Sequence, residues 1–214
     1  ACGPDKRDAA AYSPGDFYSY VTRYLGFKRN RHEGKITGLA AYASPDDLFD
    51  KIEDLLAIDV KEASFSSSVS AFRNSQERRP SVLLRRLVRW ALFGEMWDPL
   101  LVDELKARCA GATPEQIAAA AQWLFEKRIV ELATYWIEKS GVDKICLAGG
   151  VFANVKLNQR IAEIDGVDEV FVHPNMGDGG LSVGAAMWCL NEHPNGIKEF
   201  ARNPLDNVFL GPEF

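Results

Sequence analysis

Two glycine-rich turns near the C-terminal end of the chain have residue types and spacings suited to phosphate chemistry. The first contains Gly149 and Gly150, and the second is the run Gly-Asp-Gly-Gly at 177–180. Short apolar runs precede them, at 144–147 and 169–172, and helix-like patterns follow. A backbone without Cβ atoms can approach a phosphate closely, and a following helix N-terminus offers free N–H groups. The two turns therefore predict the wall of a nucleotide or phosphate site.

The second turn also carries a candidate metal ligand. Asp178 lies between Gly177 and Gly179, where no bulky side chain shields its carboxylate. One carboxylate does not make a metal site, because transition metals generally take three or more protein ligands. His173 could face the same crevice if it ends the preceding strand. A strand-end histidine without a chemical role is the favoured alternative.

Asn154 follows the first turn and is a candidate ligand-binding residue. A side-chain amide at the start of a helix can cap the helix or form a hydrogen bond to a ligand. A double glycine after a strand is also often only a tight turn. The turn matches neither the Walker pattern nor the complete dinucleotide fingerprint. From these residues alone, the ligand site and the simple turn both stay open.

A third candidate is the cluster His32, Glu33, Gly34 and Lys35. A lysine and a histidine beside a glycine can neutralise phosphate charge or transfer a proton, so His32 and Lys35 are candidate catalytic residues. The alternative is a solvated turn between two helices. The small apolar segment 37–42 permits close packing and would hold the charged cluster against the body of the protein.

Composition bounds the class of protein. The chain has 214 residues, 47% of them hydrophobic and 26% charged, as in an ordinary globular protein. A formal net charge of −5 argues against broad electrostatic binding of nucleic acid. No apolar run reaches the roughly 18–20 residues that span a bilayer, and no signal peptide is visible, so a cytoplasmic location is expected. The four cysteines are far apart in the sequence and are expected to be small buried thiols.

The predicted elements alternate toward the C-terminus. Thr113 as N-cap, Pro114 at the first helical position and Gln116 closing a capping box predict a long central helix that Gly141 ends. The pattern then predicts a strand over 144–148, a helix over 154–164, a strand over 168–173 and a helix over 179–192. This alternation is typical of a parallel α/β architecture.

Earlier segments are less regular. Helical spacing predicts a helix over 17–25, with Asp16 as N-cap and Gly26 as the stop, and a shorter helix over 45–56. A strand is expected within 64–70. The run 82–90 is read as an amphipathic helix whose arginines form a solvated face or, less often, bind an anion.

The segments 24–27, 32–42, 147–154 and 177–186 together resemble the signature of the nodulation-protein and cephamycin type O-carbamoyltransferases. That family is similar in fold to the actin-like (ribonuclease H-like) ATPase superfamily, in particular to the tRNA threonylcarbamoyl transferases. The resemblance implies an enzyme that uses carbamoyl phosphate and ATP to form carbamoyl-adenylate. It would then pass the carbamoyl group to a hydroxyl of a sugar or natural-product acceptor.

The resemblance also implies residue roles. Glu33 and Lys35 would lie near the ribose and phosphates of ATP, and Asp178 would match a metal-ligand aspartate for an iron-type or magnesium ion. The nucleotide wall would comprise Gly149, Gly150, Val151, Asn154, Gly177 and Gly179.

The chain departs from the family in having no His-x-x-x-His metal motif, since its histidines lie at 32, 173 and 193. Residues 1–214 are therefore expected to be the second half of an actin-like nucleotide-binding domain, without its N-terminal half and without a C-terminal carbamoyl-phosphate domain. Such a fragment is expected to be inactive alone. The alternatives are an enzyme like the threonylcarbamoyl transferases and a non-catalytic nucleotide-binding module.

Overall fold

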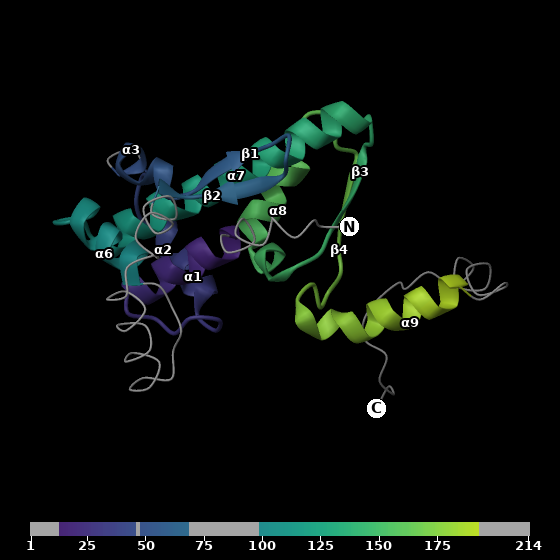
Figure 1. Ribbon diagram of the computed structural model, residues 1–214, viewed down its shortest axis with the longest axis horizontal. Helices are drawn as coiled ribbons and strands as arrows, with labels where there is room; N and C mark the ends of the chain where they lie inside the picture. Colours follow the sequence, from purple (N-terminus) through teal and green to yellow (C-terminus); the bar gives the residue numbers. More distant parts are fainter. Residues whose placement is uncertain (1–12, 46–47, 69–98, 193–214) are drawn as a thin grey trace, which may run out of the picture.

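The computed structural model describes residues 13–45, 48–68 and 99–192. Figure 1 shows one long helix, α7, with α1, α2 and α6 around its N-terminal half and the strands β3 and β4 beside its C-terminal end. The helices are α1 (Pro14–Tyr24), α2 (Glu33–Ala40), α3 (Phe49–Ile52), α6 (Pro99–Arg108), α7 (Pro114–Ser140), α8 (Val155–Ala162) and α9 (Leu181–Glu192). The strands are β1 (Ala57–Asp59), β2 (Ser64–Ser66), β3 (Lys144–Leu147) and β4 (Glu169–Val172). Short 3-10 helices are η3 (Glu53–Leu55), η4 (Gly150–Ala153) and η5 (Asp178–Gly180).

The long helix α7 begins and ends where its sequence predicts. The Thr113 hydroxyl accepts from the Gln116 backbone N–H at 3.3 Å, and the Gln116 side chain accepts from the Thr113 N–H at 2.9 Å. This capping box satisfies two N–H groups that the helix itself cannot bond. Gly141 follows in the left-handed conformation with φ of 68°. The prediction of a long central helix is confirmed.

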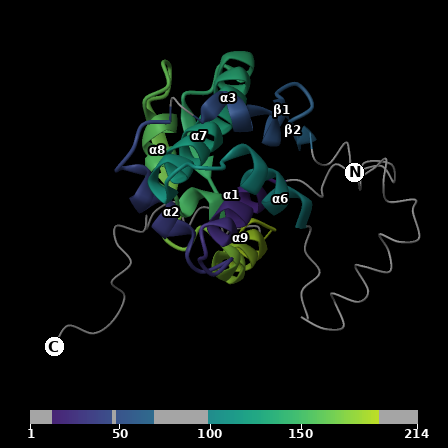
Figure 2. The same ribbon diagram turned by 90° about the vertical axis from the view of Figure 1, so that its left-hand side faces the viewer.

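The core lies where α1, α2 and α3 pack on α7 and α6 packs on α1 and α3 (Figure 2). Alanines at 118–121 bring the α7 backbone close to α2, and Phe125 fills the space against α1. Burying a phenylalanine or leucine side chain contributes about 1.5–3 kcal/mol, so this apolar face is what holds the helices together. The largest fully buried side chains include Phe17, Val21, Ile36, Leu101, Leu105, Leu124 and Phe125.

The first helix starts earlier than its hydrophobic spacing suggests. Ser13, not Asp16, is the N-cap: its hydroxyl accepts from the Asp16 N–H at 3.0 Å and also donates to the Asp16 carboxylate at 3.0 Å. Pro14 occupies the first helical position, where its missing N–H costs nothing. The prediction of Asp16 as cap was therefore wrong, whereas Gly26, with φ of 83°, does follow the end of the helix.

The His-Glu-Gly-Lys cluster is the start of a helix. His32 is the N-cap residue of α2, and the helix continues to Ala40, which packs this segment on α7. The alternative of a solvated turn is therefore wrong for 33–35. The short apolar residues of 37–40 allow the close contact between the two helices.

Two further predictions hold only in part. The helix expected over 45–56 is α3 followed by η3, and residues 46–47 lie outside the described residues. The strand expected within 64–70 is β2, which pairs antiparallel with β1 over three residue pairs. Helix α6 was not predicted. The helix predicted over 82–90 lies outside the described residues.

The predicted strand–turn–helix alternation is confirmed. Strands β3 and β4 are parallel neighbours, with Lys144 opposite Glu169 and Leu147 opposite Val172, and α8 is the connecting helix. The described residues therefore form an α/β structure, with one parallel and one antiparallel pair of strands. A helix between parallel strands is the usual crossover connection.

The prediction of buried cysteines holds only in part. Cys109 is buried, but Cys146 and Cys189 are exposed. Side chains alternate along β3, so Leu147 is buried while Cys146 points to the other face, beside Phe171, which is 54% exposed. Cys189 lies on α9, and every residue of that helix is exposed.

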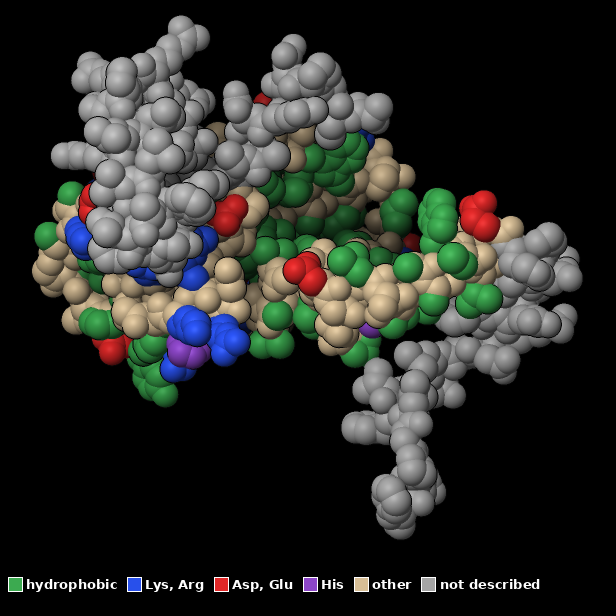
Figure 3. Space-filling view, turned by 60° about the horizontal axis from the view of Figure 1, so that its bottom comes forward, with side chains coloured by type: hydrophobic (Ala, Val, Ile, Leu, Met, Phe, Trp, Pro, Cys, Tyr) green, Lys and Arg blue, Asp and Glu red, His purple; other side chains and the backbone are tan. Residues whose placement is uncertain are grey.

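Helix α9 carries apolar side chains on its exposed surface. Figure 3 shows them along the arm on the right of the view. Leu181 and Trp188 are the most exposed, at 70% and 66%. No helix in the described part of the chain is both long and apolar enough to cross a membrane.

Candidate functional site

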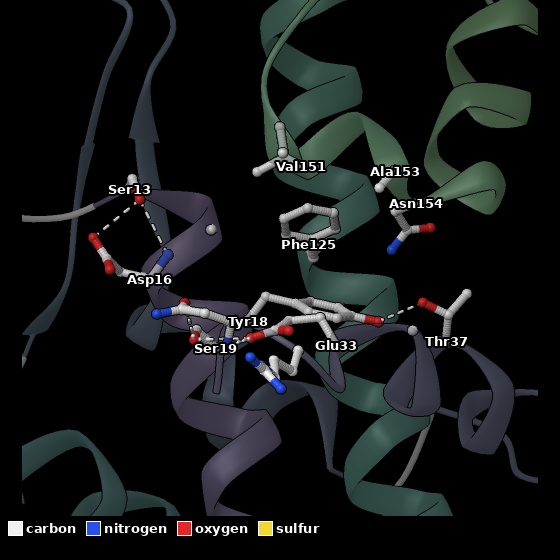
Figure 4. A pocket seen from close by; sticks show the side chains of 15 residues that line it. Ser13, Asp16, Tyr18, Ser19, Glu33, Thr37, Phe125, Val151, Ala153 and Asn154 are labelled. Carbon is white, nitrogen blue, oxygen red and sulfur yellow. Dashed lines mark hydrogen bonds between the residues drawn. The ribbon is translucent and has the colours of Figure 1, made fainter. Parts of the chain in front are cut away.

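A cavity of about 600 Å³ opens between α1, α2, α7 and the turn that leads into α8 (Figure 4). Its walls are mixed. Phe125 and Val151 give it apolar surface, and polar side chains of α1, α2 and the N-cap of α8 face it from the other sides. The polar lining includes Asp16, Tyr18, Ser19, Glu33, Thr37 and Asn154. Such a combination of apolar surface and a few placed polar groups is typical of small-molecule sites.

Four of the residues predicted to bind nucleotide meet in this cavity. Glu33 comes from α2, Gly150 and Val151 from η4, and Asn154 from the N-cap of α8. These segments are far apart in the sequence, and packing of α2 and α8 on the same helix, α7, brings them together. Glu33 of the third sequence cluster and Gly150 of the first glycine turn are thus parts of one site.

Glu33 is held by the loop before α2. Its Oε1 accepts from the Asn30 backbone N–H at 2.6 Å and from the Ser19 hydroxyl at 3.0 Å. The Arg29 guanidinium donates to the same Ser19 hydroxyl at 3.0 Å. Asn30 has φ of 58°, a conformation that asparagine tolerates better than most residues. Both hydrogen bonds reach Oε1, so Oε2 can accept a donor from a ligand.

Asn154 caps α8 and also lines the cavity, and its role in binding a ligand stays a prediction. Its Oδ1 accepts from the Leu157 backbone N–H at 3.1 Å, which caps α8. Its amide also forms a reciprocal pair with the buried side chain of Gln122, with N–O distances of 2.9 and 3.1 Å. Capping and lining of the cavity are therefore compatible, since different atoms of one amide serve them.

Tyr18 is a cavity residue that the sequence did not reveal. Its hydroxyl donates to Gln122 Oε1 at 2.5 Å and lies 2.9 Å from the Thr37 hydroxyl, and its ring packs against Phe125 with centroids 4.8 Å apart. Burial raises the pKa of Tyr18 well above its usual range, so the hydroxyl stays protonated near neutral pH. The only sequence signal for this network was Gln122, a polar residue directly after four alanines in a buried stretch.

The first glycine turn has a conformation that requires glycine. Gly149 has φ of 118° and ψ of 152°, a region essentially restricted to glycine. Its N–H donates to the Met176 carbonyl at 2.7 Å, so the turn is tied to the second one. Gly150 lines the cavity, and Gly149 does not.

The second glycine turn is packed on itself. A Cβ added at Gly180 would lie 2.2 Å from the Asn175 carbonyl oxygen, and one at Gly179 would lie 2.5 Å from the Asn175 side chain. His173 Nδ1 accepts from the Asn175 N–H at 3.1 Å, so that nitrogen serves the turn. Gly177, Asp178 and Gly179 do not belong to the cavity lining. Gly179 and Gly180 are therefore required by the packing of the turn, independently of any ligand.

The described residues do not provide a complete set of ligands for the predicted metal ion. Among the described residues, no group of three or more His, Cys, Asp or Glu side chains is placed to hold a metal ion. Asp178 supplies one carboxylate at the start of η5. A metal at this position needs further ligands from elsewhere, and the described residues do not fit one by themselves.

His32 and Lys35, the predicted catalytic pair, lie on another side of α2. His32 Nδ1 accepts from the Lys28 N–H at 3.2 Å, and the His32 ring meets the edge of Phe27. Lys35 Nζ lies 5.1 Å from the centre of the same Phe27 ring. Neither side chain lines the cavity. Their catalytic role stays a prediction.

Comparison with known proteins identifies related sequences. A family model described as carbamoyltransferase N-terminus matches residues 8–187. The uncharacterized protein sll1178 of Synechocystis is 30% identical over 213 residues, which cover 95% of this chain and 31% of that protein. The uncharacterized protein MJ1058 of Methanocaldococcus jannaschii is 28% identical over 176 residues, covering 82% of this chain and 25% of that one. The nodulation protein NolO of Bradyrhizobium diazoefficiens is 26% identical over 206 residues, covering 94% and 32%. The chain thus spans about a quarter to a third of the length of these relatives.

Proposed function

The chain belongs to the carbamoyltransferase family, and we propose that it forms the nucleotide-binding part of an ATP-dependent O-carbamoyltransferase. The whole enzyme would use carbamoyl phosphate and ATP to make carbamoyl-adenylate and then transfer the carbamoyl group to a hydroxyl of a sugar or natural product. In this proposal residues 1–214 are the second half of an actin-like nucleotide-binding domain.

One observation carries the nucleotide assignment. Glu33, Gly150 and Asn154, chosen from separate sequence segments, line one cavity of about 600 Å³. That volume lies within the range of about 300–1,000 Å³ found for small-molecule sites.

The polar groups suit the parts of a nucleotide. Glu33 Oε2 can accept from ribose hydroxyls, and the Asn154 amide can donate to an acceptor atom of the ligand. Phe125 and Val151 offer apolar surface to the base.

Asp178 contributes one carboxylate to a metal site in the full-length protein, where other ligands complete it. A divalent ion bound there would neutralise charge on the phosphate oxygens of ATP. The hydrogen bond between Gly149 and Met176 supports this placement, because it keeps the second turn beside the first.

Calorimetric titration of ATP into the full-length protein tests the proposal. The wild type and Asp178→Ala are compared with and without a divalent ion. We expect metal-dependent binding by the wild type and loss of the metal dependence in the variant. Equal binding by both proteins would remove Asp178 from the metal site, and no binding by either would reject the nucleotide site.

Activity is measured separately, as release of pyrophosphate from ATP that depends on carbamoyl phosphate. The full-length protein should show it. The 214-residue chain alone should show no carbamoyl transfer, and turnover by the purified chain would contradict the proposed division of the enzyme.

A further inference from the structure

A buried glutamine on α7 connects the polar residues of the cavity. Gln122 is 5% exposed and is bonded to Tyr18 on α1, to Asn154 at the start of α8 and to Glu126 on its own helix. Thr37 on α2 joins the group through Tyr18. Figure 4 shows the hydroxyls of Tyr18 and Thr37 pointing toward each other, with Asn154 above them. One side chain thus links four elements at the cavity wall.

All the hydrogen-bonding capacity of the Gln122 amide is used. Oε1 accepts from the Tyr18 hydroxyl at 2.5 Å and from Asn154 Nδ2 at 2.9 Å. Nε2 donates to Glu126 Oε1 at 2.6 Å and to Asn154 Oδ1 at 3.1 Å. An amide has two donor hydrogens and two acceptor lone pairs, so none is left over.

Glu126 fixes which way this amide points. A carboxylate only accepts, so turning Gln122 around would place Oε1 against Glu126 and bring two acceptors together. Glu126 is itself held by Arg160, whose Nε donates to Oε2 at 3.2 Å. The ion pair between Glu126 and Arg160 therefore determines the orientation of Gln122, and Gln122 together with the Leu157 N–H determines that of Asn154.

The hydrogen bonds leave Asn154 with one group for a ligand. Its Oδ1 already accepts from Gln122 and from the Leu157 backbone N–H, so both lone pairs are used. Its Nδ2 gives one of two hydrogens to Gln122. The second hydrogen lies near the Tyr18 hydroxyl, whose pKa burial raises and Asn154 lowers to a smaller extent, and it has no closer acceptor among the described residues. Figure 4 shows this nitrogen on the side that faces Phe125 and Tyr18.

We propose that Gln122 is a positioning residue of the nucleotide site, which holds Asn154 so that its amide N–H, and not its carbonyl, faces the ligand. This positioning role rests on the nucleotide-binding function proposed above. The same glutamine takes the Tyr18 proton, so the Thr37 hydroxyl must donate to Tyr18 and turn its lone pairs outward. The wall therefore offers a donor at Asn154 and acceptors at Thr37 and Glu33.

The test replaces Gln122 with methionine in the full-length protein and measures ATP affinity by calorimetry. Methionine keeps the volume and removes all four hydrogen bonds. We expect ATP to bind about tenfold more weakly, the effect of losing one well-placed hydrogen bond. The matched control is Gln159→Met on α8, whose amide is exposed and bonds only to Lys156 and Glu163 among the described residues. That variant should bind ATP within twofold of the wild type.

A second variant separates positioning from general structure. Asn154→Ser keeps a good N-cap for α8 but loses the N–H that the ligand would use. If Gln122 acts through Asn154, the double variant Gln122→Met, Asn154→Ser should bind ATP no more weakly than Asn154→Ser alone. If the double variant loses ATP affinity by the product of the two single losses, Gln122 acts independently of Asn154 and the proposal is overturned.

Two further outcomes are distinguishable. Wild-type affinity in Gln122→Met would overturn the positioning role and leave the proposed function standing. No ATP binding by the wild type would reject the proposed function and this inference with it. If Gln122→Met does not fold, Glu126→Met gives the same test, because it removes the acceptor that orients Gln122. Unchanged ATP affinity in that variant would also overturn the proposal.

Discussion

The backbone N–H of Gly149 donates to the carbonyl oxygen of Met176 at 2.7 Å, which joins the two glycine turns of the chain. The bond forms because β3 and β4 are parallel neighbours, so their carboxyl ends lie at the same edge. In α/β sheets this edge is where ligands commonly bind. The first turn continues into the cavity wall, and the second carries Asp178 beside it.

Gly149→Ala should destabilise the protein by about 1–3 kcal/mol, the cost of a non-glycine residue in a conformation reserved for glycine. Its φ of 118° is the physical reason. Urea unfolding of the purified chain measures the change. Gly150→Ala is the matched control, because Gly150 has no positive φ and nothing within 4 Å of an added Cβ. Equal losses in both variants would contradict the prediction.

Glu33→Gln should weaken ATP binding to the full-length protein by about tenfold or more, because hydrogen bonds to a charged acceptor contribute about 1.5–3 kcal/mol. The amide also changes the bonds that Oε1 makes to Ser19 and Asn30. Calorimetry gives the affinity, and Glu163→Gln at the C-cap of α8, outside the cavity, serves as the control. An unchanged dissociation constant would exclude Glu33 from the binding site.

The ion pair of Glu53 should make stability depend on pH. A hydrogen bond from Lys127 Nζ, at 3.1 Å, is the main cause that lowers the pKa of Glu53 below its ordinary value of 4.5, and Arg128 adds to it. A lowered folded-state pKa means that this stabilisation is present above pH 4.5 and is lost as the pH falls through the lowered value.

Lys127→Met tests that dependence. The difference in unfolding free energy between wild type and variant should be larger at neutral pH than in acid, where Glu53 is protonated in both. Urea unfolding across this range measures it. Lys106→Met is the control, since its exposed ion pair with Asp103 is 3.7 Å long and should matter little at any pH. A pH-independent difference for Lys127→Met would refute the prediction.

Thr113→Ala should cost about 1 kcal/mol by removing the N-cap of α7. Thr113→Ser keeps a hydroxyl that can accept from Gln116, so it should retain most of the stability. Thermal unfolding of the two variants beside the wild type decides the point. An equal loss of thermal stability in both variants would mean that the threonine methyl group, and not the cap, stabilises the helix.

Local signals in the sequence determined the elements that depend on local chemistry. Thr113 and Gly141 set the ends of α7, and the alternation of apolar runs and glycines set β3, α8 and β4. The cap at Ser13 is signalled by Pro14 and not by the apolar spacing, which begins only at Phe17 and therefore predicts Asp16 as the cap. Caps and turns can be predicted because the groups that form them lie within a few residues of one another.

Only the tertiary structure decided which of the chemical candidates share a site. Glu33 and Asn154 meet because α2 and α8 both pack on α7, whereas His32 and Lys35 turn toward Phe27. Exposure of Cys146 likewise depends on which face of the sheet a helix covers. The sequence by itself determined residue types, helix ends and the family resemblance. The side chains of the cavity come together because helices pack on one another. That packing joins residues far apart in the sequence, so no local pattern predicts it.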